Sequence, residues 1–98
     1  MNSQSFSPIE NIKIAATTSS GTASFTAKGI ATTQLLVSNE STATAFVRWG
    51  VGAQTALTTD CAVLGGTSQL FNKGLADTVA TILSAGTGNV YFSSGEGS

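Results

Sequence analysis

The side chains that could carry chemistry are few, and the carboxylates come first. The sequence holds five acids, Glu10, Glu40, Asp60, Asp77 and Glu96. Two neighbouring carboxylates could act as general acid and base on a glycosidic bond, and a cluster of them could bind calcium. No spacing among the five requires two of them to meet, and no Asp-x-Asp-x-Asp arrangement occurs. We therefore expect solvated loop acids, with no catalytic residue and no metal site.

The single cysteine and the glycine pairs add little. Cys61 opens an apolar run over residues 61–64, and the sequence contains no histidine to activate it. Because a reactive thiol needs a basic or cationic neighbour, we expect Cys61 to fill the core. The glycine pairs at residues 50–52 and 86–88 resemble phosphate loops only superficially, since neither precedes a predicted helix. We interpret both as turns and expect no cofactor.

Trp49 and Arg48 form the most distinctive pair of neighbours. Exposed Trp and Tyr can stack on sugar rings, and Arg can anchor an interface. Neighbouring strand residues point to opposite faces, so Trp49 shares a face with Val47 and Ala45, which favours a place in the core. Arg48 then points outward with Phe46, and the two form a candidate contact patch. If Phe46 points inward instead, both faces of the strand are covered, and the sequence leaves these alternatives open.

Composition argues against nucleic acids and membranes as partners. The 98 residues carry a net charge of −1, and only 9% of them are charged. No basic field exists to attract an anionic polymer or surface, and no apolar run approaches the length of a membrane span. The first residues lack the apolar stretch of a secretory signal. A lone cysteine fits a protein made in a reducing compartment and equally a secreted protein without disulfides. The low charge fits either burial in an assembly or a surface kept soluble by its 13 Ser and 15 Thr.

Apolar residues recur with a period of two, as in half-buried strands. We expect one strand over residues 22–28 and a hairpin over about 33–50. Residues 75–85 are interpreted as strand rather than helix because β-branched residues dominate them. About eight short strands, roughly 8–12 residues apart, predict an all-β fold: an antiparallel β-sandwich or small barrel, jelly-roll-like.

Three segments follow from this pattern. Residues 1–10 are predicted to be an N-terminal arm, residues 11–94 a single β-sandwich domain, and residues 95–98 a C-terminal tail. Phe6 and Ile9 are the large apolar side chains of the arm, and such an arm can pack on a neighbour. The predicted partner-binding residues are therefore Phe6, Ile9, Phe46 and Arg48.

Three stretches resemble small virion proteins of tailed bacteriophages. The first runs from Gln34 to Asn39 and continues over residues 44–50, and the second covers residues 66–71. The third covers residues 89–97, where Ser94 stands in place of the proline common in those proteins. The resemblance spans roughly residues 33–97 and consists of strands and turns without a catalytic signature.

This resemblance implies a capsid decoration or cement protein, which binds the outer capsid surface and reinforces the shell without catalysis. Its partners would be the major capsid protein and copies of itself, with a trimer favoured. It would be made in the host cytoplasm and would end on the virion. The alternative is a carbohydrate-binding or host-recognition β-module of a phage tail or fibre, which predicts an exposed aromatic platform at Trp49 or Tyr91. An enzyme is disfavoured because acid–base groups are scarce.

Overall fold

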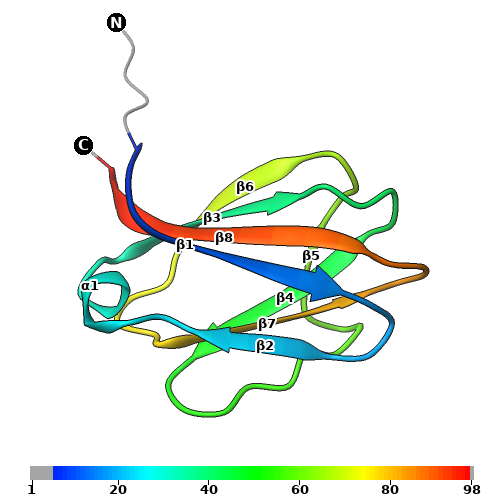
Figure 1. The fold of residues 1–98 in the computed structure, drawn as a ribbon, viewed down its shortest axis with the longest axis horizontal. Coiled ribbons are helices and arrows are strands. Elements are labelled where there is room, and N and C mark those ends of the chain that lie inside the picture. Colours follow the sequence, from blue (N-terminus) through cyan, green and yellow to red (C-terminus); the bar gives the residue numbers. More distant parts are fainter. Residues whose placement is uncertain (1–5, 98) are drawn as a thin grey trace, which may run out of the picture.

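Eight strands and one helical turn make up the computed structural model, which describes residues 6–97 (Figure 1). In chain order they are β1 (Phe6–Ala16), β2 (Gly21–Ser24), α1 (Ala27–Ile30), β3 (Gln34–Asn39), β4 (Ala45–Gly50), β5 (Cys61–Val63), β6 (Ser68–Asn72), β7 (Thr78–Leu83) and β8 (Gly88–Gly97). Sheet A has the order β1-β8-β3-β6, and sheet B has the order β2-β7-β4-β5. All pairs are antiparallel. Two such four-stranded sheets form a jelly roll, which confirms the predicted fold class.

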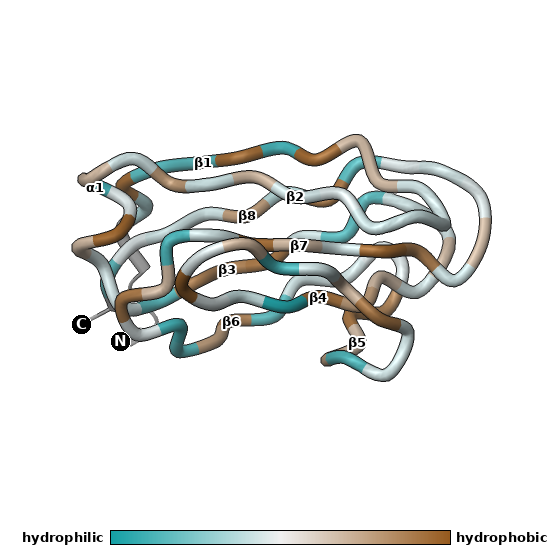
Figure 2. Tube along the Cα trace, turned by 90° about the horizontal axis from the view of Figure 1, so that it is seen from below, coloured by the Kyte–Doolittle hydropathy of each residue, from teal (hydrophilic) through white to brown (hydrophobic). Residues whose placement is uncertain are grey.

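The core lies between the sheets because alternate residues of each strand point inward. Teal and brown segments alternate along β1 in Figure 2, as a strand with one buried face requires. The largest fully buried apolar side chains come from both sheets: Phe92, Leu35, Leu83, Val37, Val47, Val63, Val79 and Val90. The strand alternation expected for β4, β7 and β8 is therefore confirmed.

The predicted hairpin over residues 33–50 is wrong, although both of its strands exist. β3 pairs with β8 and β6, whereas β4 pairs with β7 and β5. Asn39 holds the crossing between the sheets, because its Nδ2 donates to the carbonyl oxygens of Ala43 and Val63 at 2.9 Å. Its Oδ1 accepts from the Ser41 N–H at 2.9 Å. Apolar alternation specifies which residues of a strand are buried, but it does not specify the neighbouring strand.

The turn α1 replaces the end of the strand predicted over residues 22–28. β2 stops at Ser24, and the chain then crosses to sheet A. Glu10 of β1 accepts hydrogen bonds from the Thr26 N–H at 3.0 Å and from the Gly29 N–H at 3.1 Å. A Cβ at Gly29 would lie 2.5 Å from the Glu10 Oε1, so a larger residue does not fit. This contact with a distant strand ends the alternation, and the local sequence does not reveal it.

Both ends of the described chain belong to the sandwich. Phe6 pairs with Gly97 and Pro8 with Gly95 as the ends of β1 and β8. Strand pairing therefore extends beyond the predicted domain boundaries at residues 11 and 94. Residues 6–10 are held by the backbone of β8 rather than projecting as an arm. Residues 1–5 of the predicted arm and Ser98 of the predicted tail lie outside the described residues.

Candidate interaction surfaces on the two sheets

The chain's own β4–β5 loop, residues 51–60, lies over part of the outer face of sheet B (Figure 1). One end of the loop is fastened where the Gly52 N–H donates to the Asp77 Oδ1 at 3.0 Å. Ala56 in the middle of the loop is buried. Ala80 of β7 points to this face and is 0% exposed. The outer side of β7 around Ala80 is therefore closed to a partner, whereas Phe46 and Arg48 of the neighbouring strand β4 stay partly exposed.

Phe46 and Arg48, two of the predicted partner residues, lie on this partly covered face. Arg48 donates to the Asp60 Oδ1 at 3.1 Å, and the Asp60 Oδ2 accepts from the Leu57 N–H at 2.7 Å. Arg48 thus fastens the second end of the loop. Phe46 is half-exposed and lies opposite Ala62 of β5. The alternative in which Phe46 points outward is confirmed, while binding of a partner by either residue stays a prediction.

The other two predicted partner residues belong to β1. Ile9 lies at the register shift between Pro8 and Glu10 and is 47% exposed. The backbone of Phe6 begins β1, and its side chain lies outside the described part of the chain. Ile9 lies on a strand of sheet A, whereas Phe46 and Arg48 point outward from sheet B, so the structure places them on different surfaces.

The outer face of sheet A has no comparable cover in residues 6–97 (Figure 1). Tyr91 and Ser93 of β8 lie at its centre and are half-exposed. Leu36 of β3 faces Ser93 on one side and Leu70 of β6 on the other, and Leu70 is 40% exposed. Among the described strand residues that point to this face, the charged one is Lys13 of β1, which lies opposite Tyr91. This face is broad, open and nearly neutral.

The charged groups at the α1 end of the sandwich make internal contacts. Lys73 is 5% exposed. Its Nζ donates to three backbone carbonyl oxygens at 2.7–3.2 Å, those of Thr32, Gly74 and Ala76. Burial lowers the pKa of Lys73, and the nearby charge of Glu96 opposes that shift. Glu96 in turn accepts from the Thr33 N–H and hydroxyl at 3.0 and 2.8 Å. These side chains stabilise the fold, and neither offers a free acid–base group.

Two more carboxylates hold backbone segments. Desolvation raises the pKa of Glu10, but the Thr26 and Gly29 hydrogen bonds and the charge of Lys28 outweigh it and hold that pKa below its ordinary value. A hydrogen bond from the Thr78 hydroxyl, followed by that of the Gly52 N–H, lowers the pKa of Asp77. Asp60 is used in the same way beside Arg48. The expectation of freely solvated acids is therefore wrong for these residues. Glu10 and Asp77 accept from backbone N–H groups of distant segments, and Asp60 accepts from Arg48 and from the Leu57 N–H within its own loop.

Trp49 lies on the core side of β4, as the alternation predicts. Its ring packs against Phe71 of β6 with centroids 4.8 Å apart and an angle of 44° between the planes. Tyr91, by contrast, lies on the open face of sheet A. Of the two aromatic residues named for sugar stacking, Trp49 therefore points toward the core and Tyr91 points outward, so they do not form one platform.

Cys61 is exposed, and its predicted place in the core is wrong. β5 has three residues and is the outermost strand of sheet B, so no further strand covers it. Within the apolar run only Val63 is buried, and Leu64 is 60% exposed. Among residues 6–97, no three side chains of His, Cys, Asp or Glu come close enough to hold a metal ion.

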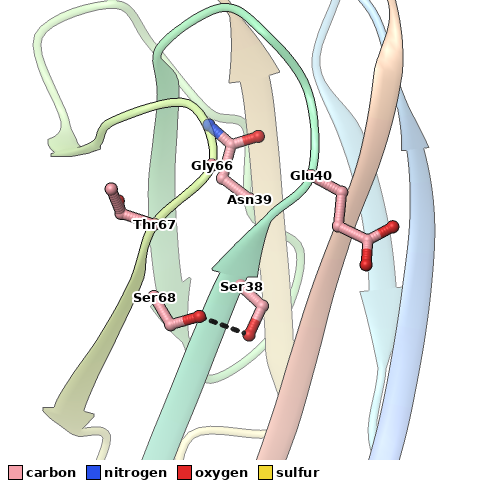
Figure 3. A pocket seen from close by; sticks show the side chains of 6 residues that line it. All are labelled: Ser38, Asn39, Glu40, Gly66, Thr67 and Ser68. Atoms are coloured by element: carbon pink, nitrogen blue, oxygen red, sulfur yellow. Dashed lines mark hydrogen bonds between the residues drawn. The ribbon is translucent and has the colours of Figure 1, made fainter.

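A shallow polar pocket of about 480 Å³ opens where β3 ends and β6 begins (Figure 3). It is lined by Ser38, Asn39, Glu40, Gly66, Thr67 and Ser68. The Ser68 hydroxyl donates to the Ser38 hydroxyl at 2.9 Å, and the Asn39 amide is engaged inside the fold. Glu40 points away from the two serines in Figure 3. The pocket can hydrogen-bond a polar group, but it lacks the paired acid and base of a hydrolase.

Sequence reasoning missed both the cover on sheet B and the open edge of sheet A at β6. The apolar residues Ala56 and Leu57, within the otherwise polar stretch of residues 55–60, were the available signal for the cover. The loop itself has no periodicity, so its path over the sheet is a tertiary feature. The described helical segment is far too short to cross a membrane.

No protein-family model and no curated protein sequence matches this chain. Among solved structures, it is similar to a chain described by the words "Bacillus endospore appendages form a novel family of disulfide-linked pili". The TM-score is 0.52 and the sequence identity 15%, and the match covers 96% of this chain and 91% of that chain. At this identity, the similarity shows that the two chains share a fold.

Proposed function

We propose that this chain is a non-enzymatic structural subunit that associates with copies of itself in a larger assembly, and specifically that it decorates the outer surface of a tailed-bacteriophage capsid. The open outer face of sheet A carries this proposal. Tyr91, Ser93 and Leu36 present a nearly neutral surface there, with Lys13 at its margin. A face with a single charged group at its margin keeps the large desolvation cost of charges small when it is pressed against a partner.

The structural neighbour supports the coarser half of this proposal. That protein is described as forming pili, so the fold they share serves there as the building block of an assembly. The capsid surface as the place of assembly comes from the phage-like stretches around residues 34–50, 66–71 and 89–97. A decorating subunit needs only modest affinity, because many copies on one lattice act together.

The neighbour's pili are described as disulfide-linked, and this sequence can use that chemistry only sparingly. The 98 residues contain one cysteine, Cys61, which is exposed on β5. One thiol per chain joins two chains and is then consumed. An assembly of more than two copies of this sequence therefore depends on non-covalent contacts.

Imaging of decorated capsids tests the proposal. Purified protein is mixed with empty capsids of a tailed phage that carries the gene, and the particles are examined by electron microscopy. We expect added density on the outer surface. Ser93→Arg places a charge at the centre of the open face of sheet A and should abolish that density. Thr22→Arg is the matched control, because Thr22 is exposed on β2 and points to the outer side of sheet B.

The proposal would be contradicted if the capsids showed no added density and the protein were monomeric at every concentration. A solution mass of three chains would support the trimer implied by the phage resemblance, and any larger assembly of copies supports self-association alone. Binding to a glycan array that is lost in Tyr91→Ala would instead support the sugar-binding module of a tail or fibre. Turnover of a substrate would contradict the non-enzymatic role.

A further inference from the structure

Three of the four outer strands in this sandwich are protected against pairing with another chain. β2 and β5 have four and three residues, too few for a stable ladder. β1 carries the charged residues Glu10 and Lys13 and a register shift at Pro8. The fourth, β6, reads Ser-Gln-Leu-Phe-Asn and pairs with β3 without a register shift. Its free side leaves a row of backbone N–H and C=O groups, the feature that invites a further strand.

The base that could guard this edge is turned away from it. A lysine at an edge strand normally blocks pairing, because its charge would be desolvated by an added strand. Lys73 follows β6 directly, yet its Nζ is buried and bonded to the Thr32 carbonyl oxygen at 2.7 Å. No charged side chain of the described residues therefore stands on β6 itself.

Apolar side chains flank the open backbone on both faces of β6. On the outer face, Leu70 is 40% exposed and faces Leu36 across the strand pair. On the inner face, Phe71 is half-exposed and packs against Trp49, which is also half-exposed. A strand added here would bury apolar surface on both faces of β6.

We propose that β6 pairs with β6 of a second copy, antiparallel about a two-fold axis at Leu70, so that two sheets A join into one eight-stranded sheet. This deepens the self-association of the proposed function and rests on it. β6 has five residues, so pairing over its full length places Leu70 opposite the second copy's Leu70. An uncharged strand meets no like charge when it pairs with itself.

This register makes a continuous apolar row across the joined sheet. Leu36 and Leu70 of one copy lie beside Leu70 and Leu36 of the second copy on the outer face. On the inner face, Gln69 meets the second copy's Phe71 and covers the exposed rim of the Trp49–Phe71 pair. The contact closes on itself by symmetry and leaves Tyr91 and Ser93 free for a capsid surface.

A charge at the symmetry axis tests the pairing. Leu70→Lys brings two ammonium groups together across the two-fold axis, and it should weaken self-association by on the order of tenfold or more. Leu57→Lys is the matched control, since Leu57 is 49% exposed on the loop over sheet B. Association is measured as solution mass against concentration by analytical ultracentrifugation, and circular dichroism checks that both variants fold.

Cross-linking tests the register without perturbing charge. In a Cys61→Ser background, Leu70→Cys should give a disulfide-linked dimer on oxidation, because directly opposed Cα atoms lie about 4.5–5.5 Å apart. Gln69→Cys in the same background should stay monomeric on denaturing gels, because in this register residue 69 faces residue 71 of the second copy.

The outcomes separate this inference from the proposed function. If wild-type protein associates but Leu70→Lys associates equally well and Leu70→Cys does not cross-link, pairing through β6 is wrong while self-association stands. If wild-type protein is monomeric at every concentration, both self-association and pairing through β6 are wrong. Weakened association of Leu70→Lys together with the residue-70 cross-link supports the proposal.

Discussion

Sheet A and sheet B each have four strands and share one core, but different things cover their outer faces. In sheet B, residues 51–60 lie over part of the outside, and Ala80 of strand β7, which points to that face, is fully buried. In sheet A, Tyr91 and Ser93 occupy the equivalent place on the central strand β8 and remain half-exposed. A strand that is buried on both faces contributes only to the stability of the fold, whereas a strand with one exposed face can also contact a partner.

The residues on the two faces match this difference. A small side chain stands on β7 where the loop must pass closely, and Arg48 and Asp60 fasten that loop at 3.1 Å. On sheet A, hydroxyl, tyrosine and leucine side chains face solvent without fastening anything above them. The ion pair between Arg48 and Asp60 thus holds a loop over sheet B. Among the described residues, no comparable contact holds a loop over the outer face of sheet A.

The largest expected effect comes from placing the same charge on each face. Ala80→Arg buries a cation without a partner and should lower the free energy of unfolding by about 3–5 kcal/mol. Ala15→Arg, on the exposed outer side of β1, should change it by less than about 0.5 kcal/mol. Urea unfolding measures both, and Ala80→Val provides a milder overpacked variant if Ala80→Arg does not fold. Equal losses for the two arginine variants would contradict the difference between the faces.

A medium effect is expected from releasing the loop. Asp60→Ala removes the acceptor of Arg48 and of the Leu57 N–H, and should cost about 1 kcal/mol, since Arg48 is partly exposed and the ion pair is screened. Hydrogen exchange at the Leu57 amide should quicken. Glu40→Ala is the control, because Glu40 is exposed away from the loop. An unchanged exchange rate at Leu57 would show that Asp60 does not hold the cover.

The smallest effect is expected from acid. The pKa of Asp77 is lower in the folded protein than in the unfolded chain, because the Thr78 hydroxyl and the Gly52 N–H bind its carboxylate. The stabilisation that the ionised Asp77 gives to the fold is complete above the ordinary aspartate pKa of about 3.9. It is lost as the pH falls through the lower pKa of the folded protein. The Gly52 amide resonance should therefore shift with acid while that of Tyr91 stays constant. In Asp77→Asn the Gly52 shift should vanish, and its persistence would exclude Asp77 as the cause.

Much of the fold could be predicted because strand alternation is local. Val47 and Trp49 on one face of β4, with Phe46 and Arg48 on the other, follow from the geometry of a single extended chain. The exposed Cys61 could not be predicted this way, because its apolar run lies on an outermost strand. The same holds for residues 6–10, whose polar composition suggested an arm although β8 pairs with them.

The candidate surfaces were harder to predict than the core. Phe46 and Arg48 were correctly placed outward, yet the loop of residues 51–60 lies over part of the face they share, and its Asp60 engages Arg48. The open face of sheet A and the free edge of β6 carry ordinary strand residues such as Ser93 and Leu70. Whether such residues can bind a partner depends on whether another strand or loop of the chain lies over them, and that depends on the strand order.

The amino-acid sequence by itself determined that the chain is all-β and which side chains of each strand turn inward, because side-chain direction alternates with every residue along an extended backbone. Only the tertiary structure decided that β3 and β4 belong to different sheets, that one sheet is partly covered and that β6 stands at an open edge. These features depend on contacts between distant segments, such as those of Asn39 with Val63 and of Arg48 with Asp60, and no local pattern encodes them.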